Sequence, residues 1–196
     1  SWLDMSGQGN DLTASGNPVL IANALGGNAV IDFDGMGDKL ERLVGLNSLP
    51  SGNADRTMYA VVNYISPGYG GITYGTPDCN QTFGLAVDGG LGHLTVQGWC
   101  EDDLVSTTLG TGAGWLVQSV VLSGSELSHF ADGLLIDTQM HFYNTVLGRL
   151  AIGVEIDNDP FLSMQVAEVL IYDRALSAAE RQQVDQYLSM KYFSMN

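Results

Sequence analysis

The chain has 196 residues and a formal net charge of −15, with 22 acidic against seven basic side chains. This charge disfavours binding to nucleic acids or anionic membranes, and no apolar run approaches the roughly 20 residues that span a bilayer. A hydrophobic content of 45% supports a core, and 25 glycines indicate many tight turns. Length and composition together predict one large β-domain.

Sixteen of the acids are aspartates and only six are glutamates. Aspartate is favoured in turns and in loops that bind hard cations. The bias therefore has two interpretations, which both stay open here. Either this is a loop-rich β-protein that binds Ca²⁺, or the aspartates only keep the surface soluble.

Short runs rich in β-branched and aromatic residues follow a polar, turn-rich opening at Met5–Ser15. Turn residues separate these runs, a pattern typical of antiparallel strands. Ser66–Gly71 is expected to be a loop, and the almost wholly apolar Trp115–Leu122 predicts a central strand buried on both faces. The expected strands are Pro18–Ala22, Ala29–Phe33, Arg56–Ile65, Thr82–Val87, His93–Gln97, Trp115–Leu122, Leu127–Ala131, Leu134–Thr138, Leu150–Ile156 and Met164–Asp173.

Two of the turns predict hairpins. Asp88–Gly92 separates two expected strands, and Asp132-Gly133 is the strongest short hairpin signal in the chain. An Asp-Gly pair suits a two-residue turn because both central residues need positive φ.

An amphipathic helix is expected at the C-terminal end. Ser177 and Glu180 have the spacing of a capping box, in which each side chain satisfies a free backbone N–H. The apolar face at three- and four-residue spacing consists of Val184, Tyr187, Leu188 and Tyr192. These elements predict an all-β fold, an antiparallel two-sheet jelly-roll sandwich closed by one C-terminal α-helix. Residues 1–196 are expected to form one domain, and the abrupt start at Ser1 suggests a module excised from a larger protein with flanking domains.

The two cysteines occupy facing positions in a predicted hairpin. If its turn is centred near Gly90, paired residue numbers sum to about 180, and Cys79 with Cys100 sums to 179. A cross-strand disulfide is therefore reasonable and would indicate an oxidising compartment, extracellular or at the cell surface. The alternative is two free thiols.

Three segments resemble laminin-G-like modules of the concanavalin A-like superfamily. Trp2–Leu12 resembles their W-x-D-x-S-G-x-G-N-D-L opening, Ala29–Gly35 resembles a strand ending in F-d-G, and Ala131–Gly133 resembles an (N/D)-G hairpin. A strand followed by a C-terminal helix, Val166–Tyr192, is also similar to the end of these modules. The resemblance implies a fold used mostly for binding glycans and proteins.

A second resemblance concerns metal binding. Leu150–Asp157 is similar to the L-G-x-E-x-D segment of pentraxins, whose carboxylates bind Ca²⁺ together with an Asp-Asn pair from an earlier loop. The resemblance implies Asp78, Asn80, Glu155 and Asp157 as ligands of at most one Ca²⁺, although Cys79 separates the first pair here. Ca²⁺ takes six to eight oxygens, and residues 155–159 carry several. The alternative is an ordinary acidic turn ended by Pro160.

Aromatic residues near these acids suggest a glycan site. Trp99, Tyr74 and Tyr69, with Asp102 and Asp103, are expected to share one rim with the possible Ca²⁺. Trp99 could instead cap the core, and Trp115 is expected to be a core residue.

The preferred hypothesis is a non-catalytic recognition module, secreted or on a bacterial cell surface, whose partner is a glycan or cell-surface ligand bound with the help of Ca²⁺. It would belong to an adhesin or a carbohydrate-active enzyme. A protein–protein assembly module without a sugar site is the first alternative. The second is a divergent glycosidase, because Glu155–Asp159 resembles the E-x-D-x-x-E signature of β-glucanases. The second glutamate of that signature is absent.

Overall fold

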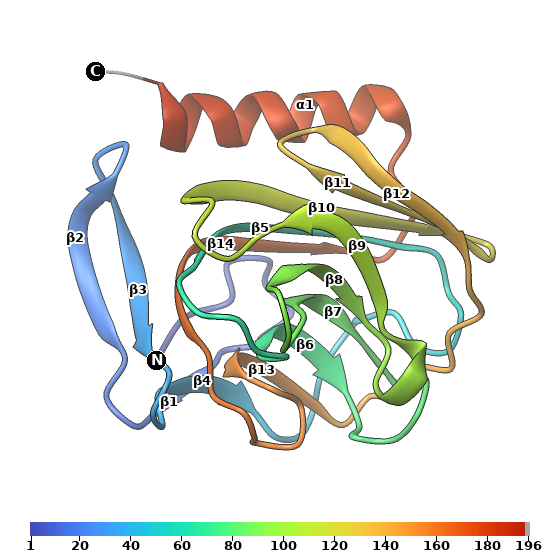
Figure 1. The fold of residues 1–196 in the computed structure, drawn as a ribbon, viewed down its shortest axis with the longest axis horizontal. Helices are drawn as coiled ribbons and strands as arrows, with labels where there is room; N and C mark the ends of the chain where they lie inside the picture. The colour runs from blue at the N-terminus through green and yellow to red at the C-terminus, as the bar shows by residue number, and fades with distance from the viewer. Residues whose placement is uncertain (195–196) are drawn as a thin grey trace.

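The computed structural model describes residues 1–194, without the side chain of Glu101. Two antiparallel sheets of seven strands each pack face to face, and one helix lies outside them (Figure 1). The first, here called the β13 sheet, has the order β1-β4-β13-β6-β7-β8-β9. The second, the β5 sheet, has the order β12-β11-β10-β5-β14-β3-β2. The predicted all-β jelly-roll sandwich is thus confirmed.

The strands of the β13 sheet are β1 (Thr13–Ser15), β4 (Lys39–Arg42), β13 (Arg149–Val154), β6 (Gly71–Gly75), β7 (Thr82–Val87), β8 (His93–Gln97) and β9 (Leu104–Leu109). Those of the β5 sheet are β12 (Leu134–Met140), β11 (Glu126–Ala131), β10 (Trp115–Ser123), β5 (Arg56–Tyr64), β14 (Ser163–Tyr172), β3 (Asn28–Asp34) and β2 (Val19–Leu25). A 3₁₀ turn covers Cys100–Asp102, helix α1 covers Ala178–Leu188, and a π-helical turn, Ser189–Phe193, continues it.

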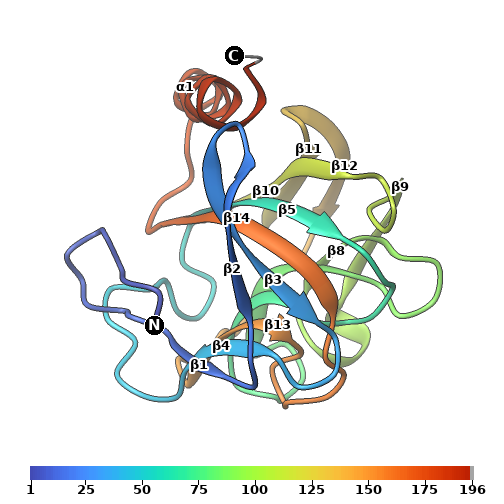
Figure 2. The same cartoon turned by 90° about the vertical axis from the view of Figure 1, so that its left-hand side faces the viewer.

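The central strand β5 is buried along almost all of its length because both of its faces are covered. Met58 and Val62 point into the main core between the sheets. Tyr59 and Val61 point the other way, into a smaller core under α1. Figure 2 shows α1 end-on above the β5 sheet, on the side away from the β13 sheet. The smaller core includes Leu188 and is one of the contacts that hold the helix to the sandwich.

The capping box of the helix and the two hairpins are confirmed, whereas Tyr187, expected on the apolar face of the helix, is exposed. Ser177 accepts a hydrogen bond from the Glu180 N–H, and the Glu180 carboxylate accepts one from the Ser177 N–H. Asp132 and Gly133 have φ of 49° and 76° and connect β11 to β12. Asp88 begins the loop between β7 and β8, where its carboxylate accepts three backbone hydrogen bonds.

Other expectations differ from the structure. Four strands, β1, β4, β6 and β9, are absent from the prediction; β1 and β4 are short, and β6 follows a glycine-containing loop. β13 ends at Val154 and not at Ile156. Gly153, with φ of 84°, forms an irregularity in the pairing with β6, where a Cβ would lie 2.5 Å from the Phe33 ring. The chain therefore leaves the sheet just before Glu155.

The expected disulfide is present. Cys79 and Cys100 are bonded, with a Cα–Cα distance of 5.2 Å. The two residues lie just beyond the paired part of the β7–β8 hairpin, in which Gly84 pairs with Gln97. The bond therefore joins the loop after β6 to the 3₁₀ turn after β8.

Candidate functional site

The candidate site lies on the face of the β13 sheet that points away from the core. Leu94 and Val96 on β8 point into the core, so the alternation of a strand turns Gln97 to the opposite face. Gln97 is nevertheless fully buried. Loop 155–160 folds back toward the start of β13, where Arg149 Nη1 donates a hydrogen bond to the Ile156 carbonyl at 2.7 Å. This loop carries Glu155 to Gln97.

Gln97 connects two loops through one amide nitrogen. Its Nε2 donates to Glu155 Oε1 at 2.8 Å and to the Tyr69 carbonyl at 3.3 Å. Glu155 is only 8% exposed. A carboxyl from the loop after β13 and a tyrosine from the loop before β6 are therefore held together by a residue of β8.

Further carboxylates surround Glu155. Burial raises the pKa of Glu155, and the nearby Asp157, Asp103 and Asp159 raise it further, so that it reaches about 8 despite the hydrogen bond from Gln97. We call these four acids the Glu155 cluster. At neutral pH the Glu155 carboxyl is mostly protonated, which avoids placing another negative charge among the other acids.

Asp103 is held by the backbone of the preceding turn. Its Oδ1 accepts hydrogen bonds from the N–H groups of Gly98 and Trp99, both at 2.9 Å. Burial raises the pKa of Asp103, against the lowering effect of these bonds, and Asp102 raises it as well. The turn that carries Trp99 is thus attached directly to the Glu155 cluster.

Two aromatic residues are joined to the cluster through their backbones, Tyr69 by its carbonyl and Trp99 by its N–H. Tyr69 is 38% exposed, and its ring lies over Gly89, where a Cβ would come within 2.6 Å of the ring. Trp99 is half-buried and has a φ of 74° at the start of the 3₁₀ turn. Tyr69 presents an accessible ring beside polar groups, which is the combination expected of a sugar platform.

One polar atom at the site has no partner. Gln97 Oε1 is buried and accepts no hydrogen bond within residues 1–194. A buried acceptor without a donor costs free energy, and such atoms are often satisfied by a bound ligand or water. Gln97 is the main residue that sequence reasoning missed, since a glutamine at a strand end carries no motif.

The placement of Tyr74 on the ligand rim is wrong. Tyr74 is fully buried in the main core. Its hydroxyl accepts a hydrogen bond from Arg56 Nη1 at 3.0 Å and donates one to the Pro50 carbonyl at 3.1 Å. Alternation along β6 turns Tyr74 inward, with Ile72, and leaves no ring surface for a ligand.

The four residues of the expected calcium set come from opposite ends of β6 and β13. Asp78 and Asn80 follow the end of β6 where Gly75 pairs with Arg149, whereas Glu155 and Asp157 follow the end of β13 where Val154 pairs with Gly71. Asp78 is exposed and is absent from the acids that shift the pKa of Glu155. The structure therefore brings Glu155 near Asp157 without Asp78.

Asn80 takes part in a different arrangement. Its Oδ1 lies 2.9 Å from His141 Nε2, and its Nδ2 donates to the Phe142 carbonyl at 2.7 Å. His141 Nε2 also lies 3.7 Å from Asp102. These contacts fasten the disulfide-bearing loop to the segment after β12, and they occupy the oxygen that would have faced a cation.

The oxygen atoms of the Glu155 cluster suit Ca²⁺ chemically but do not form a ready-made cage. Carboxylates and an amide oxygen are the donors that Ca²⁺ prefers. Within the part of the chain that the structure describes, however, no three His, Cys, Asp or Glu side chains are placed to hold a metal ion. Calcium binding stays a prediction, now centred on Glu155 and Asp157.

No model of a protein family matches the chain, and no curated protein sequence matches it either. Its fold, by contrast, is shared with many solved structures. Domain 4 of AbnA, a GH43 extracellular arabinanase from Geobacillus stearothermophilus solved in complex with arabinotriose, is 16% identical with a TM-score of 0.68. The match covers 87% of this chain and 82% of that domain.

Two larger proteins contain a similar domain. A GH54 α-L-arabinofuranosidase soaked with 4-nitrophenyl α-L-arabinofuranoside is 11% identical, with a TM-score of 0.74 over 99% of this chain and 51% of the other. A structure of botulinum neurotoxin type C, whose cell entry depends on two ganglioside molecules, is 13% identical with a TM-score of 0.67. That match covers 95% of this chain and 48% of the toxin chain.

These likenesses define the class of fold. The chain is a jelly-roll β-sandwich of the kind found in these domains, and identities of 11–16% establish the fold alone. The chain spans most of the arabinanase domain and about half of the other two chains.

Proposed function

We propose that this chain is a non-catalytic glycan-binding module and that its ligand contacts Tyr69 beside the Glu155 cluster. The observation that carries the proposal is the hydrogen-bonded group Tyr69–Gln97–Glu155, in which one buried amide holds both the backbone carbonyl of Tyr69, a residue with an exposed ring, and a buried carboxyl. The ring can stack on the apolar face of a sugar, and the protonated carboxyl can donate to a sugar oxygen.

Two further facts support this assignment. The arabinanase domain, which matches over most of its length, was solved with a bound trisaccharide. The botulinum neurotoxin with a similar domain depends on gangliosides for cell entry. Laminin-G-like membership belongs to the same proposal and is supported by the order of the sequence motifs. Within it, the pairing of Trp2 with Leu12 closes the N-terminal motif into a loop.

An extracellular location is also part of the proposal. The Cys79–Cys100 bond supports it, because structural disulfides persist mainly in oxidising compartments. No helix within residues 1–194 is long and apolar enough to cross a membrane. The module would act as part of a larger protein, as the arabinanase domain does.

A glycan array followed by calorimetry tests the proposal, with arabino-oligosaccharides and ganglioside glycans among the ligands. Tyr69→Ala should weaken binding by at least about tenfold, the loss of one well-stacked aromatic contact. Tyr187→Ala is the matched control, since Tyr187 is similarly exposed, at 41%, but lies on α1 over the other sheet. Equal loss in both variants, or no binding to any glycan, would contradict the proposal.

The calcium part of the proposal has a separate test. When Ca²⁺ binds, it would displace the proton of Glu155, so that Glu155 and Asp157 hold the cation and the cation takes over the contact with the sugar oxygen. We expect this Ca²⁺ to strengthen glycan binding, and Asp157→Asn to abolish that effect while leaving the fold intact. Calorimetric titration with CaCl₂, and repetition of the glycan titration in a chelator, would measure it. If the chelator does not change glycan binding, the role of calcium is contradicted, whereas the proposal of glycan binding stands.

A second candidate, a glycoside hydrolase, is favoured by one observation. The raised pKa of Glu155, about 8, is the property of a carboxyl that serves as a general acid. Release of reducing sugar from arabinan that disappears in Glu155→Gln would support hydrolysis. Binding without any release would leave the recognition module as the function.

A further inference from the structure

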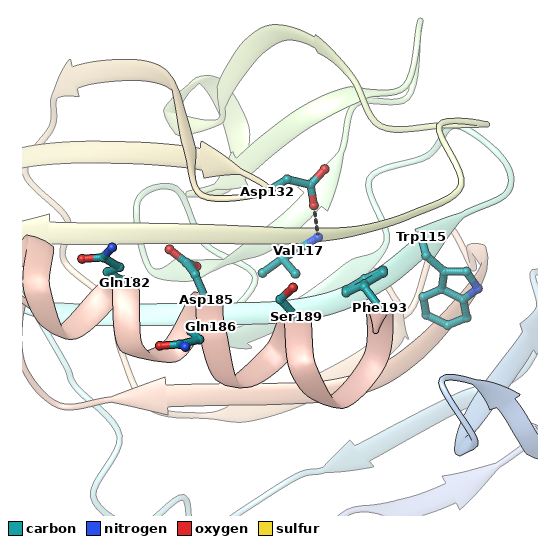
Figure 3. Close-up of a pocket in the computed structure, with 8 residues that line it drawn as sticks. All are labelled: Trp115, Val117, Asp132, Gln182, Asp185, Gln186, Ser189 and Phe193. Carbon is teal, nitrogen blue, oxygen red and sulfur yellow. Dashed lines mark hydrogen bonds between the residues drawn. The ribbon is translucent and has the colours of Figure 1, made fainter. Parts of the chain in front are cut away.

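A pocket of about 650 Å³ lies between α1 and the β5 sheet (Figure 3). Trp115 and Val117 of β10 line one side, and Asp185 and Ser189 line the other. The Glu155 cluster lies on the outer face of the opposite sheet, so the thickness of the sandwich separates the two places. This pocket therefore cannot be a part of the proposed glycan site.

One end of the pocket is aromatic. Trp115 begins β10, and Phe193 lies in the π-helical turn after α1. Figure 3 shows the two rings next to each other at the same end of the helix. Trp115 is half-buried at the edge of the smaller core, so its expected role as a plain core residue is only partly right.

The middle of the pocket is acidic. Asp132, in the β11–β12 turn, accepts a hydrogen bond from the Val117 N–H at 2.8 Å through one oxygen. Asp185 projects from α1 toward the same place (Figure 3). Burial raises the pKa of Asp185, and the charge of Asp132 raises it too, against the lowering effect of Arg181. The two carboxylates are therefore near neighbours.

One carboxylate oxygen of Asp185, Oδ1, is buried and has no hydrogen-bond partner in the described part of the protein. The hydroxyl of Tyr59, which is 1% exposed beneath α1, also has none. Burial raises the pKa of that hydroxyl most, and the charge of Asp185 is the next cause. Tyr59 does not line the pocket, so Asp185 Oδ1 is the unpartnered atom on the pocket side, with the Tyr59 hydroxyl beneath the helix.

The basic residues near this helix form their direct contacts with other groups, although the charge of Arg181 still acts on Asp185. Arg181 stacks on the Phe130 ring at 4.1 Å, and Lys191 pairs with Glu168 at 3.0 Å. Across residues 1–194, no salt bridge to Asp132 or Asp185 is formed, and no Lys or Arg lines the pocket. The pocket consequently presents negative charge beside two aromatic rings.

We infer that this pocket binds an organic cation, a primary alkylammonium group held between Asp132 and Asp185 with its carbon chain against Trp115 and Phe193. An ammonium supplies three donors to acceptor-only carboxylates and is attracted to aromatic faces. The net charge of −15 concentrates cations near the surface. A free amine and the side chain of a lysine share this chemistry.

Titrations followed by Trp115 fluorescence and calorimetry test the inference. Pentylamine and cadaverine represent free amines, Nα-acetyl-lysine methylamide represents a lysine side chain, and 1-pentanol is the uncharged analogue. We expect the amines to bind and pentanol not to bind. The more tightly bound of the two amine types identifies the source of the ammonium group.

The decisive comparison uses two variants with the same change in charge. Asp185→Asn should weaken amine binding by at least about tenfold, whereas Asp173→Asn, an exposed acid at the other end of the sheet, should change it less than about twofold. Equal weakening in both variants would mean diffuse attraction to an acidic protein and would overturn the inference. Binding of pentanol or of neutral sugars as strong as that of the amines would also overturn it.

If Asp185→Asn does not fold, the wild-type protein still decides the question. Its amide and indole resonances can be followed by NMR during the pentylamine titration. Shifts concentrated on Trp115, Asp132 and residues 182–193 would support the pocket, and shifts spread over the acidic surface would overturn it.

Discussion

Gln97 Nε2 donates a hydrogen bond to Glu155 Oε1 at 2.8 Å beneath the folded-back loop 155–160. The amide and the carboxyl are 58 residues apart in the chain, and both are almost fully withdrawn from solvent. This pair places a titratable group among other acids, and its protonation links stability to pH.

Glu155→Gln should remove a pH-dependent loss of stability. The folded protein keeps the proton up to a pKa of about 8, whereas the unfolded chain loses it near the ordinary glutamate pKa of 4.5. The wild-type stability from this group is therefore complete below about pH 4.5 and falls as the pH rises to 8, by at most about 1.4 kcal/mol per pH unit. Urea unfolding at pH 5, 6.5 and 8 should show a flatter profile for the variant. Glu126→Gln, at an exposed position, should keep the wild-type slope, and parallel profiles for wild type and Glu155→Gln would refute the effect.

His129 should make the stability of the fold decrease as the pH falls, which is the opposite of the effect of Glu155. It is 1% exposed, and burial lowers its pKa to about 4, with a smaller raising effect of Asp137. The His129 Nε2 lies 3.0 Å from the amide nitrogen of Gln118. The amide oxygen of Gln118 already accepts a hydrogen bond from the Tyr64 hydroxyl. A protonated ring would place two donors face to face. Stability should fall as the pH drops from 6.5 toward 4, and His129→Gln should lessen that fall in thermal unfolding scans. An unchanged acid profile in a folded variant would contradict this.

Replacing Arg56 by lysine should destabilise the fold by on the order of 3 kcal/mol. The Arg56 guanidinium is fully buried and donates to Tyr74, Thr145 and several carbonyls. Lysine has fewer donors and lacks the planar fork, so some of these acceptors would lose their partners. Arg174→Lys, at a side chain that is 53% exposed, should cost less than about 1 kcal/mol. Chemical unfolding compares the two, and similar losses would show that the buried network contributes little.

Removal of the disulfide should affect both stability and binding. Cys79 and Cys100 are 21 residues apart, for which loop-closure entropy predicts a loss of about 3 kcal/mol in Cys79→Ser/Cys100→Ser. The released turn carries Trp99 and Asp103, so glycan affinity should fall as well. Reduction of the wild type by dithiothreitol should reproduce both effects. If the variant binds glycan normally but unfolds at a lower denaturant concentration, the disulfide stabilises the fold and has no role in binding.

Much of the fold was predictable because its signals are local. The alternation in Arg56–Ile65, the Asp132-Gly133 turn and the Ser177–Glu180 capping box each depend on residues a few positions apart, and all three are confirmed. The cysteine pairing also follows from one hairpin. The strands β1 and β4 were missed because they are short and because β4 pairs with β13 from far along the chain.

The sequence by itself determined the jelly-roll class, the terminal helix and the disulfide, and it predicted a site at Glu155 and Asp157. Only the tertiary structure decided that Tyr74 is internal, that Asn80 bonds to His141, and that Gln97 joins Tyr69 to Glu155. Strand periodicity sets which face a residue occupies, but the loop that covers that face comes from elsewhere in the chain. The burial of a side chain and its pKa depend on which loop or helix lies over it. The two sites proposed on opposite faces of the sandwich depend on the same packing.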